Sequence, residues 1–438
     1  MTRRTVMTPK EHEQRIREIA QRVAERLVDE WPEAGAHVND LEDFAERMGQ
    51  GLQREVSERT LREEAQRKES NQSACSCGAS ARYQRRHPLT INTAAGRLRV
   101  QRAYYLCSAC GKGHCPADVW LGLGPANTTP TAQARLAVLS ALEPYVQVAD
   151  LCAQLGVPLR VDLKSTERVT QALGERLAAW DLRPHGRATR PVAVGFDGVM
   201  IKTWEGRKEA RVGVIYEPDW ECGRTPAAEA GLRKEYFGTT GSRETLVAKI
   251  CARARERAGG GVVAVVCDGA ALDWMDLETY LPRRVEIFDF YHVLERVAAI
   301  ATAMHGSDPA AAAAWRAAMK KELLDLGPWE LLRQLEAWQP PDADAAEVRR
   351  VQLAYFERQE ERMRYADYLR RGFPIGSGAV EGACKHLVVD RFRGSGMRWK
   401  LPTADPVLHV RAALLTTPRL DLRQFATTKP PKKAVAQA

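Results

Sequence analysis

The sequence contains no long apolar run, and no apolar segment follows its basic start. Nothing in the 438 residues approaches the roughly 18 consecutive apolar residues of a membrane-spanning helix. The opening stretch, MTRRTVMTPKEHEQRIREIA, has basic residues but lacks the apolar core of a secretory signal. We therefore expect a protein that is not exported and has no membrane partner. No internal repeats are evident either.

Cysteine is scarce outside one short stretch of the chain. Five of the ten cysteines lie between Cys75 and Cys115, and the other five are isolated. Without an export signal, such a cluster favours metal ligands over disulfides. Two close pairs, CSC at 75–77 and CSAC at 107–110, flank the strand-like segments PLTINT and RLRVQRAYYLC, which AAG joins. This pattern predicts a zinc-ribbon-like β-hairpin whose structural Zn²⁺ ligands are Cys75, Cys77, Cys107 and Cys110.

The first cysteine pair departs from the usual spacing, because only one residue separates Cys75 from Cys77. His87, His114 and Cys115 are candidate substitutes, and cysteines that bind no metal are the alternative. Closed four-ligand zinc sites stabilise folds rather than catalyse reactions, so we expect a structural role here.

Basic residues outnumber acidic residues in the chain. The 65 Lys and Arg residues exceed the 56 Asp and Glu residues, for a net charge of +9. This balance suits a polyanionic partner such as nucleic acid, although many basic proteins bind none. The composition, 45% hydrophobic and 28% charged, is that of a globular protein with one large or two to three ordinary domains.

Changes of pattern along the chain predict several segments. They are a helical N-terminal arm (1–70), the zinc-ribbon-like hairpin (71–125), a helical DNA-binding region (126–182), the first part of an α/β core (190–304), a helical insertion (305–372), the final part of the core (373–420) and a disordered tail (421–438). A polar linker, DLRPHGRATRP, precedes the core. In the third segment, the break at Gly156-Val157-Pro158 and the candidate N-cap Ser165 resemble a helix-turn-helix, although any small helical bundle produces such a pattern.

After residue 190 the pattern alternates between strands and helices. PVAVGFDGVMIKTW, EARVGVIYEP and LRKEYFGTTG predict three strands, followed by a helix, the strand GVVAVVCDGA, a second helix and the strand in RVEIFDFYHVLERV. This order matches a ribonuclease H-like core, in which the first and fourth strands lie side by side. The predicted fold class is therefore α/β, with a ribonuclease H-like catalytic core and an all-helical insertion.

Three carboxylates lie in settings typical of a site. Asp197 and Asp268 each end an apolar run and precede glycine, and Glu381 lies in GSGAVEGACKH. Two adjacent strand ends bring two carboxylates together, and such oxygen ligands hold a pair of magnesium ions about 3.5–4 Å apart for phosphodiester chemistry. The alternative is that each Asp-Gly pair is only a turn or a helix cap.

Three segments carry a resemblance to a known family: DGVMIKTWEGRKEARVGVIY, CDGAALDWMDLETYLPRRVEIFDFYHVLERV and PIGSGAVEGACKHLVVDRFRGSGMRW. Together they resemble bacterial insertion-sequence DDE transposases of the ISKra type, which are related to Mutator-like transposases. The resemblance covers about residues 70–415. It implies that Asp197, Asp268 and Glu381 form the catalytic triad and bind Mg²⁺ or Mn²⁺, and that the 112 residues between the last two hold a helical insertion.

The resemblance also implies partners and a location. These are the terminal inverted repeats of a mobile element, its target DNA, a homo-oligomeric assembly, and the nucleoid of the bacterial cytoplasm. A second family feature is an Asp or Cys, then two residues, then His, here Asp289 and His292, which support the active site. Asp289 competes with Asp268 as the second metal ligand. We favour Asp268, because the fourth strand borders the first, and the alternative for His292 is a core histidine bonded to Asp289.

Basic and aromatic residues gather near Glu381. They are Lys385, His386, Arg391, Arg393, Arg398, Trp399 and Lys400. Such side chains suit DNA phosphates beside the metals, and the alternative is a solvated helix face. We therefore expect a DNA transposase that cleaves and joins strands. The alternatives are a domesticated, non-catalytic DNA-binding protein and a metal-dependent nuclease on the same core.

Overall fold

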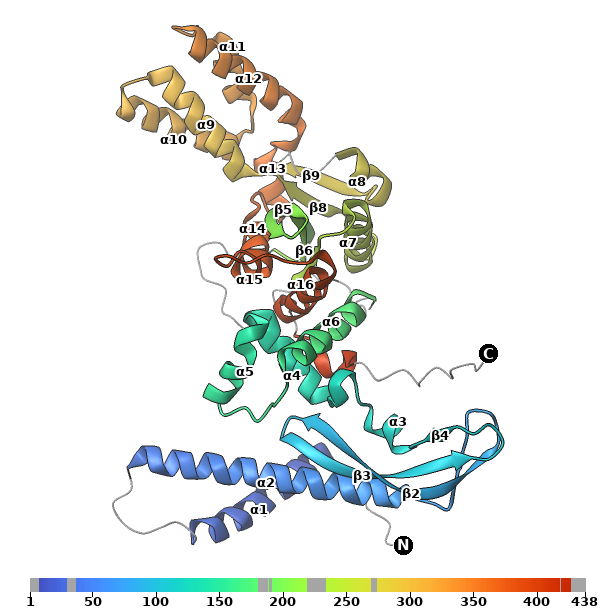
Figure 1. Ribbon diagram of the computed structural model, residues 1–438. Coiled ribbons are helices and arrows are strands. Elements are labelled where there is room, and N and C mark those ends of the chain that lie inside the picture. The colour runs from blue at the N-terminus through green and yellow to red at the C-terminus, as the bar shows by residue number, and fades with distance from the viewer. Residues whose placement is uncertain are drawn as a thin grey trace. The chain divides into compact units, whose positions relative to one another are not determined.

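The computed structural model describes residues 8–29, 37–179, 188, 191–218, 234–268, 274–417 and 419–426. The chain divides into two compact units, each of which is treated by itself below. The first unit comprises residues 1–121 and 150–160, and the second comprises residues 122–149 and 161–438 (Figure 1). Both contain helices and a sheet, so the predicted mixed α/β class is confirmed.

The first unit pairs long helices with an antiparallel sheet. Its helices are α1 (Pro9–Val28), α2 (Val38–Arg67) and the short α3 (Ala117–Leu121). The sheet follows chain order, β1 (Gln72–Ala74), β2 (Ser80–Thr93), β3 (Gly96–Cys107) and β4 (Gly113–His114). The predicted hairpin is therefore confirmed as β2 and β3, although β2 begins well before PLTINT. Gly96 closes its turn with a φ of +95°, a conformation that favours glycine.

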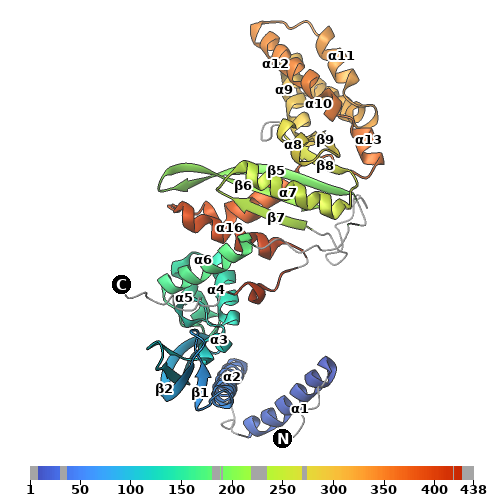
Figure 2. The same ribbon diagram turned by 90° about the vertical axis from the view of Figure 1, so that its right-hand side faces the viewer.

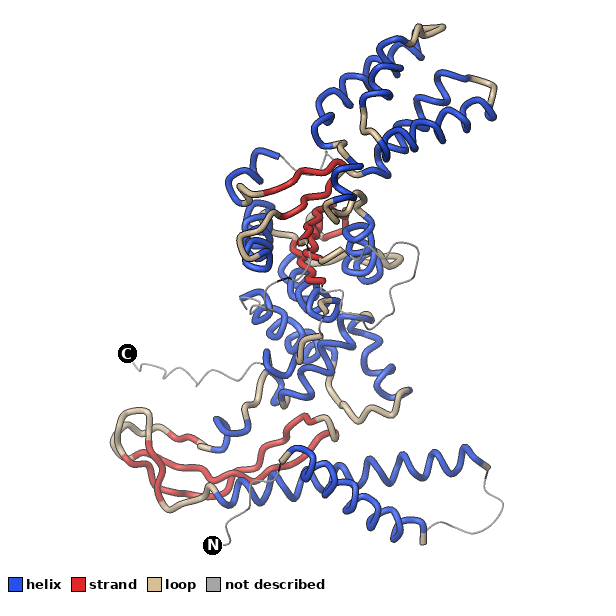
Figure 3. Tube along the Cα trace, turned by 180° about the vertical axis from the view of Figure 1, so that it is seen from behind, coloured by secondary structure: helices blue, strands red, loops and turns tan. Residues whose placement is uncertain are grey.

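A five-stranded mixed sheet forms the centre of the second unit. Its strands are β5 (Val192–Thr203), β6 (Gly206–Tyr216), β7 (Lys234–Thr239), β8 (Val263–Cys267) and β9 (Arg284–Phe288), in the spatial order β7-β6-β5-β8-β9. β5, β6 and β7 are antiparallel neighbours, whereas β8 runs parallel to both β5 and β9. The first and fourth predicted strands are therefore side by side, as the sequence indicated. Figure 3 shows the strands of this sheet in red.

Helices cover both faces of this sheet (Figure 1). On one face, α7 (Arg243–Ala258) packs its apolar side against Val192, Val194 and Phe196. α8 (Trp274–Tyr280) adds Leu277 to the same cluster. On the other face, a larger core joins the alternate residues of β5 to the C-terminal helices and to the helices that follow β9. All five residues of β8 are buried, as expected for a parallel strand covered on both sides.

The region between β9 and the last part of the core is helical, as predicted. It contains α9 (Phe290–His305), α10 (Pro309–Asp325), α11 (Trp329–Ala337), α12 (Ala343–Gln359), the 3₁₀ turn Glu360–Arg362 and α13 (Tyr365–Arg370). Tyrosines from these helices fasten them to the strand ends. The Tyr355 hydroxyl donates to the carbonyl of Asp268 at 3.0 Å, and that of Tyr365 to the carbonyl of Phe288 at 2.9 Å.

The helical region before the core differs from the predicted helix-turn-helix. After the 3₁₀ turn Pro125–Asn127 it contains α4 (Pro130–Leu142), α5 (Tyr145–Gln154) and α6 (Leu163–Ala179). Residues 155–162 join α5 to α6, a longer connection than the three- to four-residue turn of that motif. Ser165 is not the N-cap, because it lies inside α6. Asp162 accepts hydrogen bonds from the Ser165 amide at 2.9 Å and hydroxyl at 2.8 Å instead.

The C-terminal part begins with a nearly continuous helix. α14 (Gly378–Ala383) leads into a π-helical segment (Cys384–Val389) and α15 (Asp390–Phe392), and α16 (Leu401–Leu415) follows a glycine-rich stretch. The predicted disordered tail is wrong at its start, because Leu422–Phe425 form a 3₁₀ turn whose Leu422 and Phe425 are buried beside α4 and α6. Residues 427–438 of that tail, and most of the predicted linker, lie outside the described residues.

Within the described residues, no single helix is long and apolar enough to cross a membrane, and only the bent pair α4 and α5 meets that test when taken together.

Candidate functional site

The two predicted aspartates lie at equivalent positions on neighbouring parallel strands. β5 pairs with β8 from Val192–Val263 to Gly195–Val266. Asp197 and Asp268 each follow the last pair, Gly195–Val266, by two residues, and Asp268 comes directly after the end of β8. Asp197 does not end its strand, contrary to prediction, because β5 continues to Thr203 as a hairpin with β6. The parallel pairing of β5 with β8, however, ends before Asp197, at Gly195.

The Asp197 carboxylate is held by the next residue of its own strand and by the π-helical segment. One oxygen accepts the amide of Gly198 at 2.6 Å, and the other accepts the thiol of Cys384 at 3.2 Å. Burial raises the pKa of the Cys384 thiol, and the charges of Asp197 and Glu381 raise that pKa further. The thiol therefore stays protonated and serves as a donor to Asp197.

Glu381 reaches the same region from α14. It lies one helical turn before Cys384, and the Ser377 hydroxyl donates a hydrogen bond to its Oε1. Among the described residues, two groups of His, Cys, Asp or Glu side chains bring at least three ligand atoms within 4.8 Å of one another. One of them consists of Asp289, His292 and Glu381. The predicted third carboxylate therefore lies beside the predicted supporting pair.

Asp289 organises this group from a fully buried position. It caps α9, where its Oδ1 accepts the Tyr291 amide at 2.7 Å. Its Oδ2 accepts the Ser377 amide at 3.0 Å and contacts His292 Nδ1 at 3.1 Å. The contact with Asp289 assigns the proton to Nδ1 and leaves Nε2 of His292 as the acceptor.

The same environment sets the charge of His292. Burial lowers the pKa of His292, but its hydrogen bond to Asp289 and the charges of Asp289, Asp268 and Glu295 outweigh burial and raise that pKa above the usual value. The charge of Asp268 therefore acts on His292. Three N–H groups already occupy the oxygens of Asp289, and these contacts favour Asp289 as a positioning residue.

Replacing Asp289 by asparagine should destabilise the fold. The new amide turns an N–H₂ group toward at least one of the N–H donors that the carboxylate accepts, inside a fully buried site. We expect a loss of about 2–4 kcal/mol in the free energy of unfolding, measured by urea denaturation. Asp390→Asn is the matched control, because it alters an exposed Asp390–His386 pair 3.0 Å apart. Equal losses in the two variants would contradict this role for Asp289.

The basic residues near Glu381 separate into two sets. Lys385, His386, Arg393, Arg398 and Lys400 are exposed. Arg391 and Trp399, predicted as DNA contacts, are only 3% and 6% exposed. Arg391 donates to the Ser140 carbonyl at 3.1 Å and lies 4.8 Å from the Trp399 ring, which stacks on Phe392 at 4.4 Å. These two side chains therefore hold the segment in place, and burial lowers the pKa of Arg391 to about 10.

The four predicted cysteines meet in the first unit and can bind zinc. Their sulfur atoms all lie within 4.8 Å of one another, with Cys75 3.6 Å from Cys110 and Cys77 3.7 Å from Cys107. Each pair sits in a turn that ends in a glycine of positive φ, Gly78 or Gly111. The short CSC spacing is thus compatible with a four-sulfur cluster of the kind that binds zinc.

The suggested substitute ligands have other contacts. His114 lies 3.2 Å from the Ser73 hydroxyl, and His87 lies 3.3 Å from an Arg102 nitrogen. Cys115 is outside the four-cysteine group. Within the cluster, the backbone amide of Cys77 is the main cause that lowers the pKa of Cys75 to about 6. A thiolate at Cys75 suits metal binding, since thiolates are the ligands of zinc.

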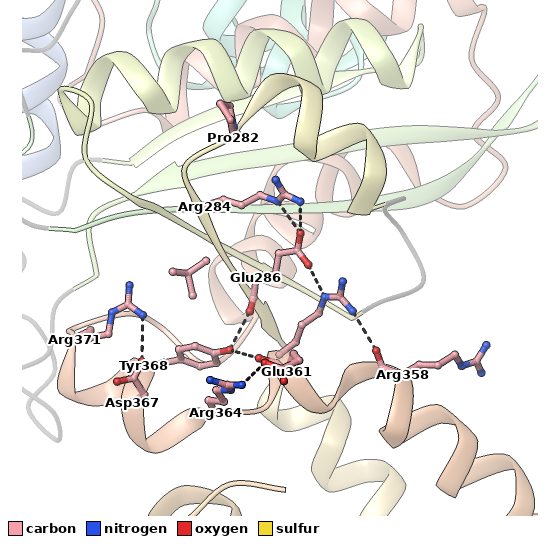
Figure 4. Close-up of a pocket in the computed structure, with 11 residues that line it drawn as sticks. Pro282, Arg284, Glu286, Arg358, Glu361, Arg364, Asp367, Tyr368 and Arg371 are labelled. Carbon is pink, nitrogen blue, oxygen red and sulfur yellow. Dashed lines mark hydrogen bonds and ion pairs between the residues drawn. The ribbon is translucent and has the colours of Figure 1, made fainter.

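A cavity of about 510 Å³ lies at the other end of β9 from Asp289 (Figure 4). Its lining is rich in arginine, but most of its charges are paired. Glu286 accepts both Arg284 and Arg362, each at 2.6 Å, and Arg371 pairs with Asp367 at 3.2 Å. The Arg362–Glu286 pair fastens the 3₁₀ turn Glu360–Arg362 to β9, and the Tyr368 hydroxyl of α13 donates to the Glu286 carbonyl at 3.2 Å. The cavity contains none of the predicted site residues.

No protein-family model matches the chain, and no curated protein matches it. The assignment of the site therefore rests on its geometry. Sequence reasoning missed Ser377 and Cys384, which bond to Glu381 and Asp197. Their spacing could have revealed them. Ser377 lies four residues before Glu381 and Cys384 three residues after it, and residues at these spacings share one side of a helix.

Proposed function

We propose that this protein is a metal-dependent DNA transposase of the DDE class with a ribonuclease H-like core. The observation that supports the proposal most is the parallel pairing of β5 with β8, whose last pair, Gly195–Val266, precedes Asp197 and Asp268 by two residues each. α14 packs on β5 and β6 and brings Glu381 to the Asp289–His292 pair. The proposal is that Asp197, Asp268 and Glu381 act together at this edge of the sheet. Of the three, Glu381 belongs with Asp289 and His292 to a group whose ligand atoms lie within 4.8 Å of one another.

The donor set fits a hard divalent cation. Asp197, Asp268 and Glu381 offer carboxylate oxygens, which Mg²⁺ and Mn²⁺ prefer to sulfur or nitrogen. When bound, such ions activate the attacking water or 3′-hydroxyl and stabilise the leaving oxygen. The chain's own contacts set the ligands: Cys384 holds Asp197, Ser377 holds Glu381, and Asp289 fixes His292. His292, with Nδ1 held by Asp289, offers Nε2 as a proton acceptor in its neutral form.

The surface around the site suits a DNA partner. Five exposed basic side chains, four from Lys or Arg and one from His, follow Glu381 within twenty residues, and the chain is basic overall. Exposed Lys and Arg side chains bind phosphates, whatever the base sequence. We assign the DNA partners as the ends of a mobile element and its target, handled by more than one copy of the chain. The four-cysteine cluster would stabilise the first unit rather than take part in chemistry.

Strand transfer is the activity that tests this proposal. The purified protein is incubated with labelled DNA carrying the inverted repeats that flank its gene, a target plasmid, and Mg²⁺ or Mn²⁺. Joined products support the transposase. Cleavage without joining favours a nuclease on the same core, and binding without cleavage favours a domesticated DNA-binding protein.

A further inference from the structure

The β5–β6 hairpin extends beyond the helix that covers its first half (Figure 2). On the face that packs on α7, Val192, Val194 and Phe196 are buried. The same face continues along the strand with Met200 and Lys202 and then Trp204 in the turn. Met200 is 48% exposed and Trp204 is 65% exposed. The far half of the hairpin therefore presents an uncovered strip, here called the ribbon face, formed by Met200, Lys202, Trp204 and Arg207.

Trp204 is exposed on a firmly held backbone. Its amide donates to the Trp399 carbonyl at 3.0 Å, and the Trp399 amide donates to the Lys202 carbonyl at 3.0 Å. The Thr203 hydroxyl closes the turn by donating to the Gly206 carbonyl at 2.6 Å. Because the backbone is fixed from two sides, an exposed indole here loses little entropy when a partner stacks on it.

The surroundings of Trp204 are basic. Arg398 places its guanidinium 5.7 Å from the centre of the indole ring. Lys202 and Arg207 are cross-strand partners, and Lys400 is exposed just after Trp399. Two carboxylates lie nearby, Glu205 and Glu209, and Glu209 is paired with Arg211 at 3.0 Å. The balance of charge on this surface is therefore positive, which complements a phosphate backbone.

We propose that the ribbon face binds DNA by stacking an unpaired base on Trp204, with Lys202, Arg207 and Arg398 contacting the flanking phosphates. Aromatic stacking requires the flat face of a base, which a duplex hides and an unpaired strand exposes. Trp204 lies seven residues after Asp197, so the stacked base would be roughly 20 Å from the carboxylates, at about 3.3 Å per strand residue. The proposal rests on the proposed function in taking DNA as the partner.

The test measures DNA binding without divalent metal. One probe is a duplex with a single-stranded arm that contains 2-aminopurine, and the other is the fully paired duplex of the same sequence. We expect the wild-type protein to quench the 2-aminopurine and to bind the forked probe about tenfold more tightly than the paired one. Trp204→Ala should remove this preference and the quenching while paired-duplex binding stays the same, and Trp204→Phe should retain part of both.

Trp329→Ala is the matched control, because Trp329 is 52% exposed on α11 and lies outside the ribbon face. It should behave as the wild type does. The proposal is overturned if the wild type shows no forked-probe preference, if Trp204→Ala keeps it, or if that variant loses paired-duplex binding equally. Because no metal is present, a negative strand-transfer assay leaves this outcome unaffected, so the two proposals fail separately.

Discussion

Asp197→Asn lowers metal-dependent DNA cleavage and joining by about a thousandfold or more. Asparagine keeps the shape of the side chain and an oxygen that can accept the Gly198 amide, but it removes the negative charge that a divalent cation needs. Metal ions supply several kcal/mol of transition-state stabilisation, and each 1.36 kcal/mol corresponds to a tenfold change in rate. The rate is measured with labelled element ends under single-turnover conditions.

Two controls make this expectation specific. Asp390→Asn changes an exposed carboxylate on α15, six residues after Cys384, and should leave the rate at the wild-type level. Binding of the same DNA by Asp197→Asn without metal should also be unchanged, since the loss lies in chemistry. An Asp197→Asn protein that cleaves as fast as the wild type would remove Asp197 from the catalytic residues.

Cys107→Ser should abolish zinc binding and release the sheet of the first unit. Cys107 is fully buried and joins the end of β3 to the cluster. Structural zinc sites of small domains contribute on the order of 10 kcal/mol at neutral pH, more than most domains have in total stability. We expect one zinc per wild-type chain by elemental analysis and none in the variant. Hydrogen exchange of residues 72–114 in the full chain should become fast.

Cys115→Ser is the matched control for zinc. Cys115 lies close to the cluster in sequence but does not belong to it. This variant should retain one zinc per chain, and hydrogen exchange of residues 72–114 should remain slow. A wild-type protein that contains no zinc after purification and does not take it up, or a Cys107→Ser protein with unchanged exchange, would contradict a structural zinc site.

Local patterns explain which parts of the fold were predictable. Apolar runs identify β5 and β6, and the solid apolar run of β8 indicates a strand covered on both faces. The four cysteines were found from spacing alone, because their pairs flank one hairpin. Asp162 took the capping role expected of Ser165, since either residue type can cap a helix.

Contacts between distant residues explain what the sequence could not predict. Arg391 looked like a DNA contact, but it is buried by Ser140, which lies 251 positions earlier in the chain. Asp289 likewise has a distant partner, because Ser377, 88 positions later, donates its amide to the Asp289 carboxylate. No local pattern records such partners, because they depend on which helices pack on the sheet.

The thiol that holds Asp197 comes 187 positions later in the chain. A ribosome that adds about 5–20 residues per second therefore takes roughly 10–40 s to supply Cys384 after Asp197 has been made. During that interval the nascent chain can pair β5 with β8. It still lacks Glu381, the Ser377 hydroxyl and the Cys384 thiol. A polypeptide released before α14 has Asp197 and Asp268 without the third carboxylate, so under the proposed function we expect such a fragment not to nick DNA.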